Sequence, residues 1–320
     1  MNLSDYDKTF IGKRAEELGF VRDTLEKVYR LADILEYLNT NPLLKESLAL
    51  KGGTAINLTI FNLPRLSVDI DLDYLKTDSR EEMLKNREII NTTVTRYMQS
   101  QGYKQSPKTK TPHSLDSWVY EYINAGGNKD IIKLEINYSL RAHILPPEER
   151  PIITEHFSSE YKVKTLAALE IFGSKLNALI NRAAPRDLYD VANMIKFGLF
   201  DESELPLLRK CVIFYAVVSA KELRKTFDTK AIDALSHHRI KTDLLPVINR
   251  KEKFDLEAAK KTVKEYIKNL MTLSGEEQEF IECFERKEYI PELLFEDDSI
   301  VSRIKVHPMV LWKIRELGDL

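Results

Sequence analysis

A run of alternating apolar and acidic residues, at positions 67 to 74, constrains the fold of this chain more than any other feature. Its apolar members are Val68, Ile70 and Leu72, and its acidic members are Asp69, Asp71 and Asp73. A side-chain period of two is that of a β-strand with one buried face. Three like charges on the other face repel one another, so packing alone gives no reason for them. We therefore expect a half-buried strand whose acidic face has a chemical task.

The segment before this strand predicts a tight turn that binds anions. Leu48 to Leu50 form a short apolar run that ends at Gly52 and Gly53, and a short helix is expected over about 54–61. Glycines let the backbone approach a ligand closely and adopt positive φ. The free N–H groups at a helix start attract phosphate. Thr54 is expected to cap this helix or to donate a hydrogen bond to a phosphate oxygen.

The acidic pair Asp69 and Asp71 is the candidate metal site. Both carboxylates face the same way on a strand, and hard oxygen ligands at this spacing suit Mg²⁺ or Mn²⁺ held jointly by the protein and a nucleoside triphosphate. Glu135, on a later alternating run, is expected to complete the site as a third metal ligand or to act as the base for an attacking hydroxyl. Arg65 and Ser67 stand just before the pair and are candidate phosphate contacts.

Hydrophobic periodicity predicts an α+β chain. Apolar residues three and four apart predict helices over 12–38 and 79–101, and a turn at 125–128 predicts a hairpin of strands at 115–124 and 130–141. From about residue 166 the pattern is helical, with helices expected at 167–180, from Pro185 onward, and at 203–226, 256–271 and 276–287. We expect an α/β lobe over 1–165 and a helical lobe over 166–320 that completes one shared cleft.

Charge is distributed unevenly along the second half. The net charge is −2, yet residues 205–270 hold 15 Lys/Arg against 8 Asp/Glu, and residues 271–300 hold 2 against 10. This pattern is typical of solvated helix faces, or of a basic surface for a nucleic-acid backbone. The two cysteines lack metal-ligand spacing, and neither a signal peptide nor a membrane-length apolar run is present, so we expect a cytoplasmic protein.

Each feature alone has an ordinary structural explanation. A Gly-Gly pair is commonly a turn, an Asp-x-Asp pair is commonly an exposed strand face, and Arg186 with Asp190 is an i,i+4 pair that could form a surface salt bridge. The turn, the acidic pair and the later acid in this order are better explained by catalysis. Nucleotidyl transfer needs little beyond positioning and charge neutralisation, often by two metal ions.

The chain resembles the AbiEii-type nucleotidyltransferases, toxins of abortive-infection and toxin–antitoxin systems to which the MenT toxins are related. The resemblance is carried by Lys-Gly-Gly-Thr-Ala at 51–55 with Arg-Leu-Ser-Val-Asp-Ile-Asp at 65–71, by Glu-Ile-Phe-Gly-Ser-Lys at 170–175, and by Arg-Asp-Leu-Tyr-Asp at 186–190. It implies a polymerase-β-like lobe with a small mixed sheet flanked by helices. The gap between Gly53 and Asp69 is longer than in that superfamily at large and is similar to the AbiEii pattern.

The resemblance also implies roles for individual residues. Asp69 and Asp71 would bind the metal, Lys175 would contact the triphosphate, and Asp187 or Asp190 would complete the catalytic site. By position, Gly52, Gly53, Thr54, Arg65, Ser67 and Arg186 are the remaining candidates for nucleotide binding.

The biological role is implied in the same way. The expected activity is NTP-dependent, pyrophosphate-releasing transfer of a nucleotide to RNA, with a tRNA 3′ end as the expected acceptor, by a toxin active in phage defence. Independently of the resemblance, a monomer is the default expectation. A separate antitoxin, an AbiEi-like transcriptional regulator, is expected, and its direct contact with the toxin is left open. Alternatives are nucleotidylation of a protein hydroxyl, an inert nucleotide-binding module, and a nuclease, which would have no triphosphate for the Gly-Gly turn to hold.

Overall fold

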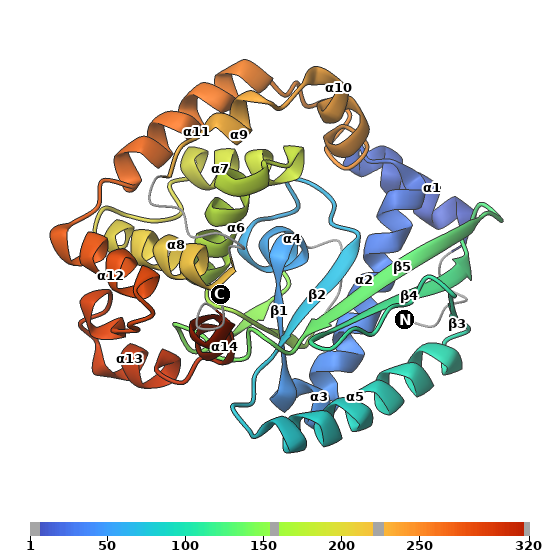
Figure 1. Ribbon diagram of the computed structural model, residues 1–320. Coiled ribbons are helices and arrows are strands. Elements are labelled where there is room, and N and C mark those ends of the chain that lie inside the picture. The colour runs from blue at the N-terminus through green and yellow to red at the C-terminus, as the bar shows by residue number, and fades with distance from the viewer. Residues whose placement is uncertain (1–6, 154–159, 220–226, 317–320) are drawn as a thin grey trace. The chain divides into compact units, whose positions relative to one another are not determined.

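A computed structural model describes residues 7–153, 160–219 and 227–316 (Figure 1). Contacts divide the chain into two compact units. Unit 1 comprises Met1–Arg141, Pro147–Leu166 and Leu245–Glu252, and unit 2 comprises Ala142–Pro146, Ala167–Leu244 and Lys253–Leu320. No helix among the described residues has the length and apolar character needed to cross a membrane.

The strands of unit 1 form one mixed sheet. They are β1 (Leu48–Lys51), β2 (Asp69–Tyr74), β3 (Lys104–Gln105), β4 (Leu115–Ile123), β5 (Lys129–Asn137), β6 (Glu148–Pro151) and β7 (Lys162–Thr165). Their order is β3-β4-β5-β2-β1-β7-β6. The predicted acidic strand and the hairpin of β4 and β5 are confirmed, whereas the short strands β3, β6 and β7 were not expected.

Strand β2 lies at the centre of this sheet (Figure 1). It pairs antiparallel with β1 and parallel with β5. Its apolar side chains Ile70 and Leu72 are buried, at 0% and 3% exposure, as the alternating pattern predicts. Burial of this side fixes the register, because a slip of one residue would turn the apolar side chains to the opposite face.

Helices of unit 1 pack around the sheet. They are α1 (Lys8–Leu18), α2 (Arg22–Thr40), α3 (Pro42–Ser47), α4 (Gly52–Ala55), the π-helical turn η2 (Ile56–Ile60) and α5 (Arg80–Ser100). The single helix expected over 12–38 is wrong: Gly19, at φ +72°, ends α1, and a second helix begins at Arg22. Within α5, Ile90 is buried, whereas its neighbour Ile89 is 49% exposed.

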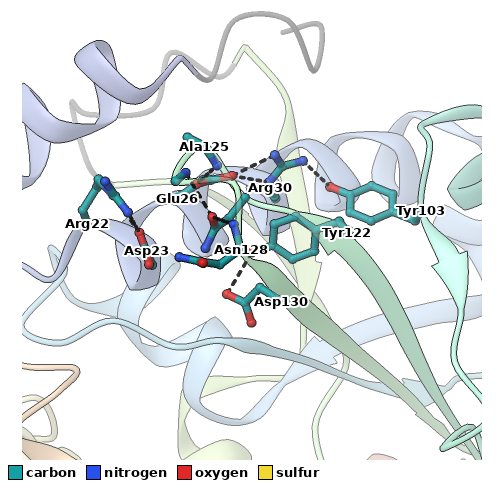
Figure 2. A network of polar contacts seen from close by, with 11 residues as sticks. Arg22, Asp23, Glu26, Arg30, Tyr103, Tyr122, Ala125, Asn128 and Asp130 are labelled. Carbon is teal, nitrogen blue, oxygen red and sulfur yellow. Dashed lines mark hydrogen bonds and ion pairs between the residues drawn. The ribbon is translucent and has the colours of Figure 1, made fainter.

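A buried polar network joins the β4–β5 hairpin to α2 (Figure 2). Glu26 is fully buried, and it accepts hydrogen bonds from Arg30 Nε at 2.9 Å and from the backbone N–H of Ala125, in the hairpin turn, at 2.8 Å. The Arg30 guanidinium lies 4.3 Å from the ring centroid of Tyr122. A buried carboxylate is tolerated only when paired in this way, so the network holds the hairpin tip against the helix.

Unit 2 is helical. Its helices are α6 (Ala168–Arg182), α7 (Pro185–Lys196), α8 (Leu205–Ser219), α9 (Lys230–Asp233), α10 (His237–Arg239), η3 (Ile240–Leu244), α11 (Leu256–Leu270), α12 (Gly275–Glu285), η4 (Pro291–Leu293), α13 (Asp298–Ile304) and α14 (Pro308–Glu316). The helices predicted from 167 onward are confirmed, except that residues 220–226 of the one expected at 203–226 lie outside the described residues. Short helices such as α9 and α10 were not predicted.

Helices α6 and α8 approach each other closely at Gly173. A Cβ atom built on Gly173 would lie 2.5 Å from Cβ of Cys211 and 3.2 Å from its carbonyl carbon. These atoms belong to the backbone and the Cβ of Cys211, so no change of rotamer can move them away. Cys211 is fully buried, and burial raises the pKa of its thiol well above the ordinary value, so it acts here as a packing residue.

We predict that Gly173→Ala destabilises the protein by about 1–3 kcal/mol, because the added methyl overpacks the α6–α8 contact. The matched control is Gly12→Ala in α1, where an added Cβ meets nothing within 4 Å. That change is expected to be neutral or to stabilise by up to about 1 kcal/mol through helix propensity. Urea unfolding measures both. Equal effects of the two substitutions would contradict the close packing at Gly173.

Candidate active site

The Gly-Gly turn requires glycine for two separate reasons. Gly52 has φ +68°, and a Cβ there would stand 2.8 Å from Asp71 Oδ2, so positive φ and close approach coincide. A Cβ on Gly53 would stand 2.7 Å from Arg65 Nη2 and 2.9 Å from Ser67 Oγ. The structure therefore brings together the turn, one acid and the two residues expected to touch phosphate.

Thr54 has a different task from the one expected. The N-cap of α4 is Lys51, so Thr54 is not the helix cap, and its side chain is 1% exposed. Its hydroxyl donates a hydrogen bond to the backbone carbonyl of Asp69. Thr54 thus ties the start of the acidic strand to the turn. Arg65 is also buried, at 2% exposure, and donates to the carbonyl of Leu66.

Strand pairing sets the acids side by side. Asp71 pairs with Glu135 on the parallel neighbour β5, and with Lys51 on β1. Laterally paired residues share a face of the sheet, so Lys51, Asp71 and Glu135 form one row across three strands. Asp69 pairs with Lys133 in the row beside it. The predicted convergence of Asp69, Asp71 and Glu135 on one face agrees with this register.

Sequence reasoning missed the two lysines of this face. Lys51 Nζ lies 2.5 Å from Oδ1 of Asp73, and Lys133 Nζ lies 2.8 Å from Oε2 of Glu135. The position of Lys133 could have been predicted, because Lys133 is two residues before Glu135 and must share its face on a strand. We call the six residues Asp69, Asp71, Asp73, Glu135, Lys51 and Lys133 the acid face.

The electrostatics of this face centre on Asp71. Burial raises the pKa of its carboxyl to about 6; the charge of Lys51 opposes this shift, and those of Asp69 and Glu135 add to it. For Lys133, burial lowers the pKa, but the hydrogen bond with Glu135 and the charges of the nearby acids outweigh it and the pKa is raised. Burial, the largest cause, is therefore not offset by the nearby lysines, and the ionised form of Asp71 is disfavoured in the protein alone.

A divalent cation would stabilise the ionised form of Asp71. Within residues 7–153, 160–219 and 227–316, no group of three or more His, Cys, Asp and Glu side chains is arranged to hold a metal ion. The predicted third ligand, Glu135, is instead bound to Lys133. Asp69 and Asp71 nonetheless offer the hard oxygen donors that Mg²⁺ prefers, in a place where negative charge is in excess.

In unit 2, the predicted Lys175, Asp187 and Asp190 come together. Lys175 Nζ lies 2.8 Å from Oδ1 of Asp187 and 2.9 Å from Oδ2 of Asp190, and the side chains of Lys175 and Asp190 are 8% and 1% exposed. Helix α6 supplies the lysine and α7 the two acids. The two carboxylates fix the position of the Lys175 ammonium group.

The turn between α6 and α7 is held by hydrogen bonds from arginines. Ala183 adopts φ +34°, which is unfavourable for a residue with a side chain. Its carbonyl accepts a hydrogen bond from Arg239 Nη1 at 3.2 Å. Arg186, expected to touch nucleotide, donates from Nε to the carbonyl of Asp243 at 2.8 Å. At least part of the Arg186 guanidinium is therefore used to hold the turn.

Glu170, in the first turn of α6, anchors the helix that carries Lys175. It is fully buried and accepts hydrogen bonds from the backbone N–H groups of Ile144 and Leu145, both at 3.1 Å, and from the Tyr215 hydroxyl at 2.5 Å. Burial would raise the pKa of this carboxyl, but hydrogen bonds from His143, Tyr215 and the backbone outweigh it, and the pKa is lowered. Glu170 therefore stays ionised inside the unit.

An acidic face beside a Gly-Gly turn on a mixed sheet is the arrangement expected of a nucleotidyltransferase, a class of enzyme that acts on nucleoside triphosphates. The family described as nucleotidyl transferase AbiEii toxin, type IV TA system, matches residues 33–280. The chain therefore belongs to the AbiEii family of toxins from type IV toxin–antitoxin systems, which confirms the resemblance seen in its motifs.

One solved structure shows that the fold is shared. MenT4, a nucleotidyltransferase toxin from Mycobacterium tuberculosis H37Rv, is 18% identical, with a TM-score of 0.63 over 93% of this chain and 98% of that chain. This likeness confirms the α+β fold class predicted from the sequence. The comparison with curated proteins gives no match.

We predict that Asp71→Asn stabilises the metal-free protein at pH 8 by about 1–2 kcal/mol, a value reduced for the partial exposure of this side chain. A carboxyl whose pKa is raised in the folded state costs stability once it ionises. The difference from wild type is therefore absent below the unfolded pKa near 3.8 and complete above the folded pKa of about 6. Urea unfolding with a chelator, across this pH range, measures it.

The matched control is Asp298→Asn, an exposed acid of α13, which is expected to change stability by less than about 0.5 kcal/mol at either pH. An Asp71→Asn protein less stable than wild type at pH 8 would contradict the excess of negative charge at this site.

Proposed function

We propose that the acid face and the Gly-Gly turn catalyse transfer of a nucleotide from a nucleoside triphosphate to the 3′ hydroxyl of an RNA, with a tRNA 3′ end as the acceptor. The observation that carries this proposal is the row of Lys51, Asp71 and Glu135, in which Asp71 lies against Gly52. In the reaction the acceptor oxygen attacks the α-phosphorus and pyrophosphate leaves. Such chemistry depends on positioning and charge neutralisation.

Asp69 and Asp71 are the residues that would hold Mg²⁺ or Mn²⁺. When bound, the ion neutralises phosphate charge and polarises the reacting phosphorus. The raised pKa of Asp71, about 6, supports this assignment, because a carboxylate whose ionised form is disfavoured by burial is stabilised by a bound cation. Thr54 holds Asp69 in place through its carbonyl, which makes Thr54 a positioning residue in this scheme.

The remaining predicted residues are assigned to the triphosphate. Gly52 and Gly53 keep side chains away from the turn, so that a phosphate can reach its backbone N–H groups. Ser67 lies against Gly53 and supplies a hydroxyl there. Lys175 is proposed to neutralise triphosphate charge, with Asp187 and Asp190 as the residues that orient its ammonium group.

An RNA acceptor is supported by the charge of the second half of the chain. Residues 205–270 carry 15 Lys/Arg against 8 Asp/Glu, and several of these lysines are exposed: Lys241, Lys251, Lys253, Lys261 and Lys268. Exposed lysines bind the phosphate backbone without regard to sequence. Blocking of tRNA 3′ ends would arrest growth, and an AbiEi-like antitoxin is the proposed partner that restrains this activity.

The testing experiment incubates the purified protein with a divalent cation, total cellular RNA and each α-labelled nucleoside triphosphate in turn. We expect label in a tRNA-sized band with wild type, and a loss of at least about 100-fold in Asp69→Asn, because a ligand of the ion that would neutralise the reacting phosphate is removed. The surface variant Asp298→Asn should match wild type. The nucleotide that labels the band is identified in the same gel.

Three other outcomes are distinguishable. Label on protein and not on RNA would replace the acceptor by a protein hydroxyl. Shortened RNA would indicate a nuclease. Nucleotide binding without pyrophosphate release, in the presence of RNA or protein, would leave an inert binding module and contradict the proposed reaction.

A further inference from the structure

The acid face carries two lysines in unequal settings. Lys51 is paired with Asp73, and their side chains are 25% and 2% exposed, so this pair is the more buried of the two. Lys133 is paired with Glu135, and their side chains are 40% and 23% exposed. A pair as open as the second is worth little net free energy, so its partners can be exchanged. A buried pair is costly to break, because it leaves an uncompensated charge.

The formal charge of the face corresponds to one divalent cation. Four carboxylates stand against two ammonium groups, which leaves a charge of −2 when all six groups are ionised. Lys133 stands among three of these carboxylates: it is bonded to Glu135, is paired in register with Asp69, and interacts electrostatically with Asp71. Its ammonium group therefore occupies the same negative region that a metal ion would enter.

We propose that Lys133 is a resident counter-ion of the acid face, which competes with free divalent cation by holding Glu135 and repelling the incoming charge. This inference rests on the proposed function, because it takes Asp69 and Asp71 as the metal-binding residues. The metal then enters most readily together with a nucleoside triphosphate, whose negative charge offsets the extra positive charge. Once the cation is bound, the Lys133 ammonium is released from Glu135 and is free to face the triphosphate.

The proposal predicts that metal binding becomes stronger when the charge of Lys133 is removed, which a purely structural role would not predict. A residue that only shapes the site weakens metal binding when it is removed. A competing cation strengthens metal binding when it is removed. Lys133→Met keeps the length of the side chain and deletes its charge, so it separates the two possibilities.

The experiment titrates Mn²⁺ into the metal-free protein without nucleotide and measures free Mn²⁺ by electron paramagnetic resonance. We expect the dissociation constant of Lys133→Met to be about fivefold to tenfold lower than that of wild type, as removal of a nearby like charge requires. Lys133→Arg retains the charge and should bind as wild type does. Lys129→Met, which removes an exposed lysine from the other end of β5, is the matched control and should also leave the constant unchanged.

Unchanged or weaker binding by Lys133→Met, in a variant that unfolds at the wild-type temperature, would overturn the inference. That result would leave the proposed function standing, provided that wild type binds Mn²⁺ and Asp71→Asn does not. Absence of Mn²⁺ binding in wild type and in Lys133→Met alike would overturn the inference. Labelled-nucleotide transfer by wild type in the presence of Mn²⁺ then shows whether the proposed function fails with it.

Discussion

The site depends on one constraint, the pairing of β2 with β1 on one side and with β5 on the other. Because the register aligns Lys51, Asp71 and Glu135, charged groups that are far apart in the sequence stand in one row. Burial of Ile70 and Leu72 on the opposite side holds this register, since a slip of one residue would bury the acids instead. The buried network around Glu26 and Arg30 holds the far end of the β4–β5 hairpin in the same way.

Both units use buried charge to position a reactive group. In unit 1, burial raises the pKa of the Asp71 carboxyl, which we propose as a ligand of a cation. In unit 2, Lys175 is held by two carboxylates, and its helix is anchored by the ionised Glu170. Such pairs contribute little net stability but restrict a side chain to one position. Reactions at phosphorus are faster when the groups that act on the phosphate are held in position.

The sequence predicts those parts whose patterns are local. The period of two in β2, the turn of the hairpin and the glycines of the turn each encode their own structure, and the motif at 186–190 indicated the partners of Lys175. The helix break at Gly19 was not predicted. The short strands β3, β6 and β7 were not predicted either, because two to four residues carry no measurable period. The hydroxyl partner of Thr54 and the ion pairs of Lys51 and Lys133 depend on which strands become neighbours, which tertiary packing decides.

The most direct test of this account is a crystal structure of the protein with Mn²⁺ and a nucleoside triphosphate analogue that cannot be cleaved between its α- and β-phosphates. Anomalous scattering locates the manganese independently of any assumed mechanism. The account predicts a peak within coordination distance of the carboxylates of Asp69 and Asp71, with triphosphate oxygens completing its shell. A manganese peak elsewhere, with these two carboxylates turned away from it, would contradict the central claim.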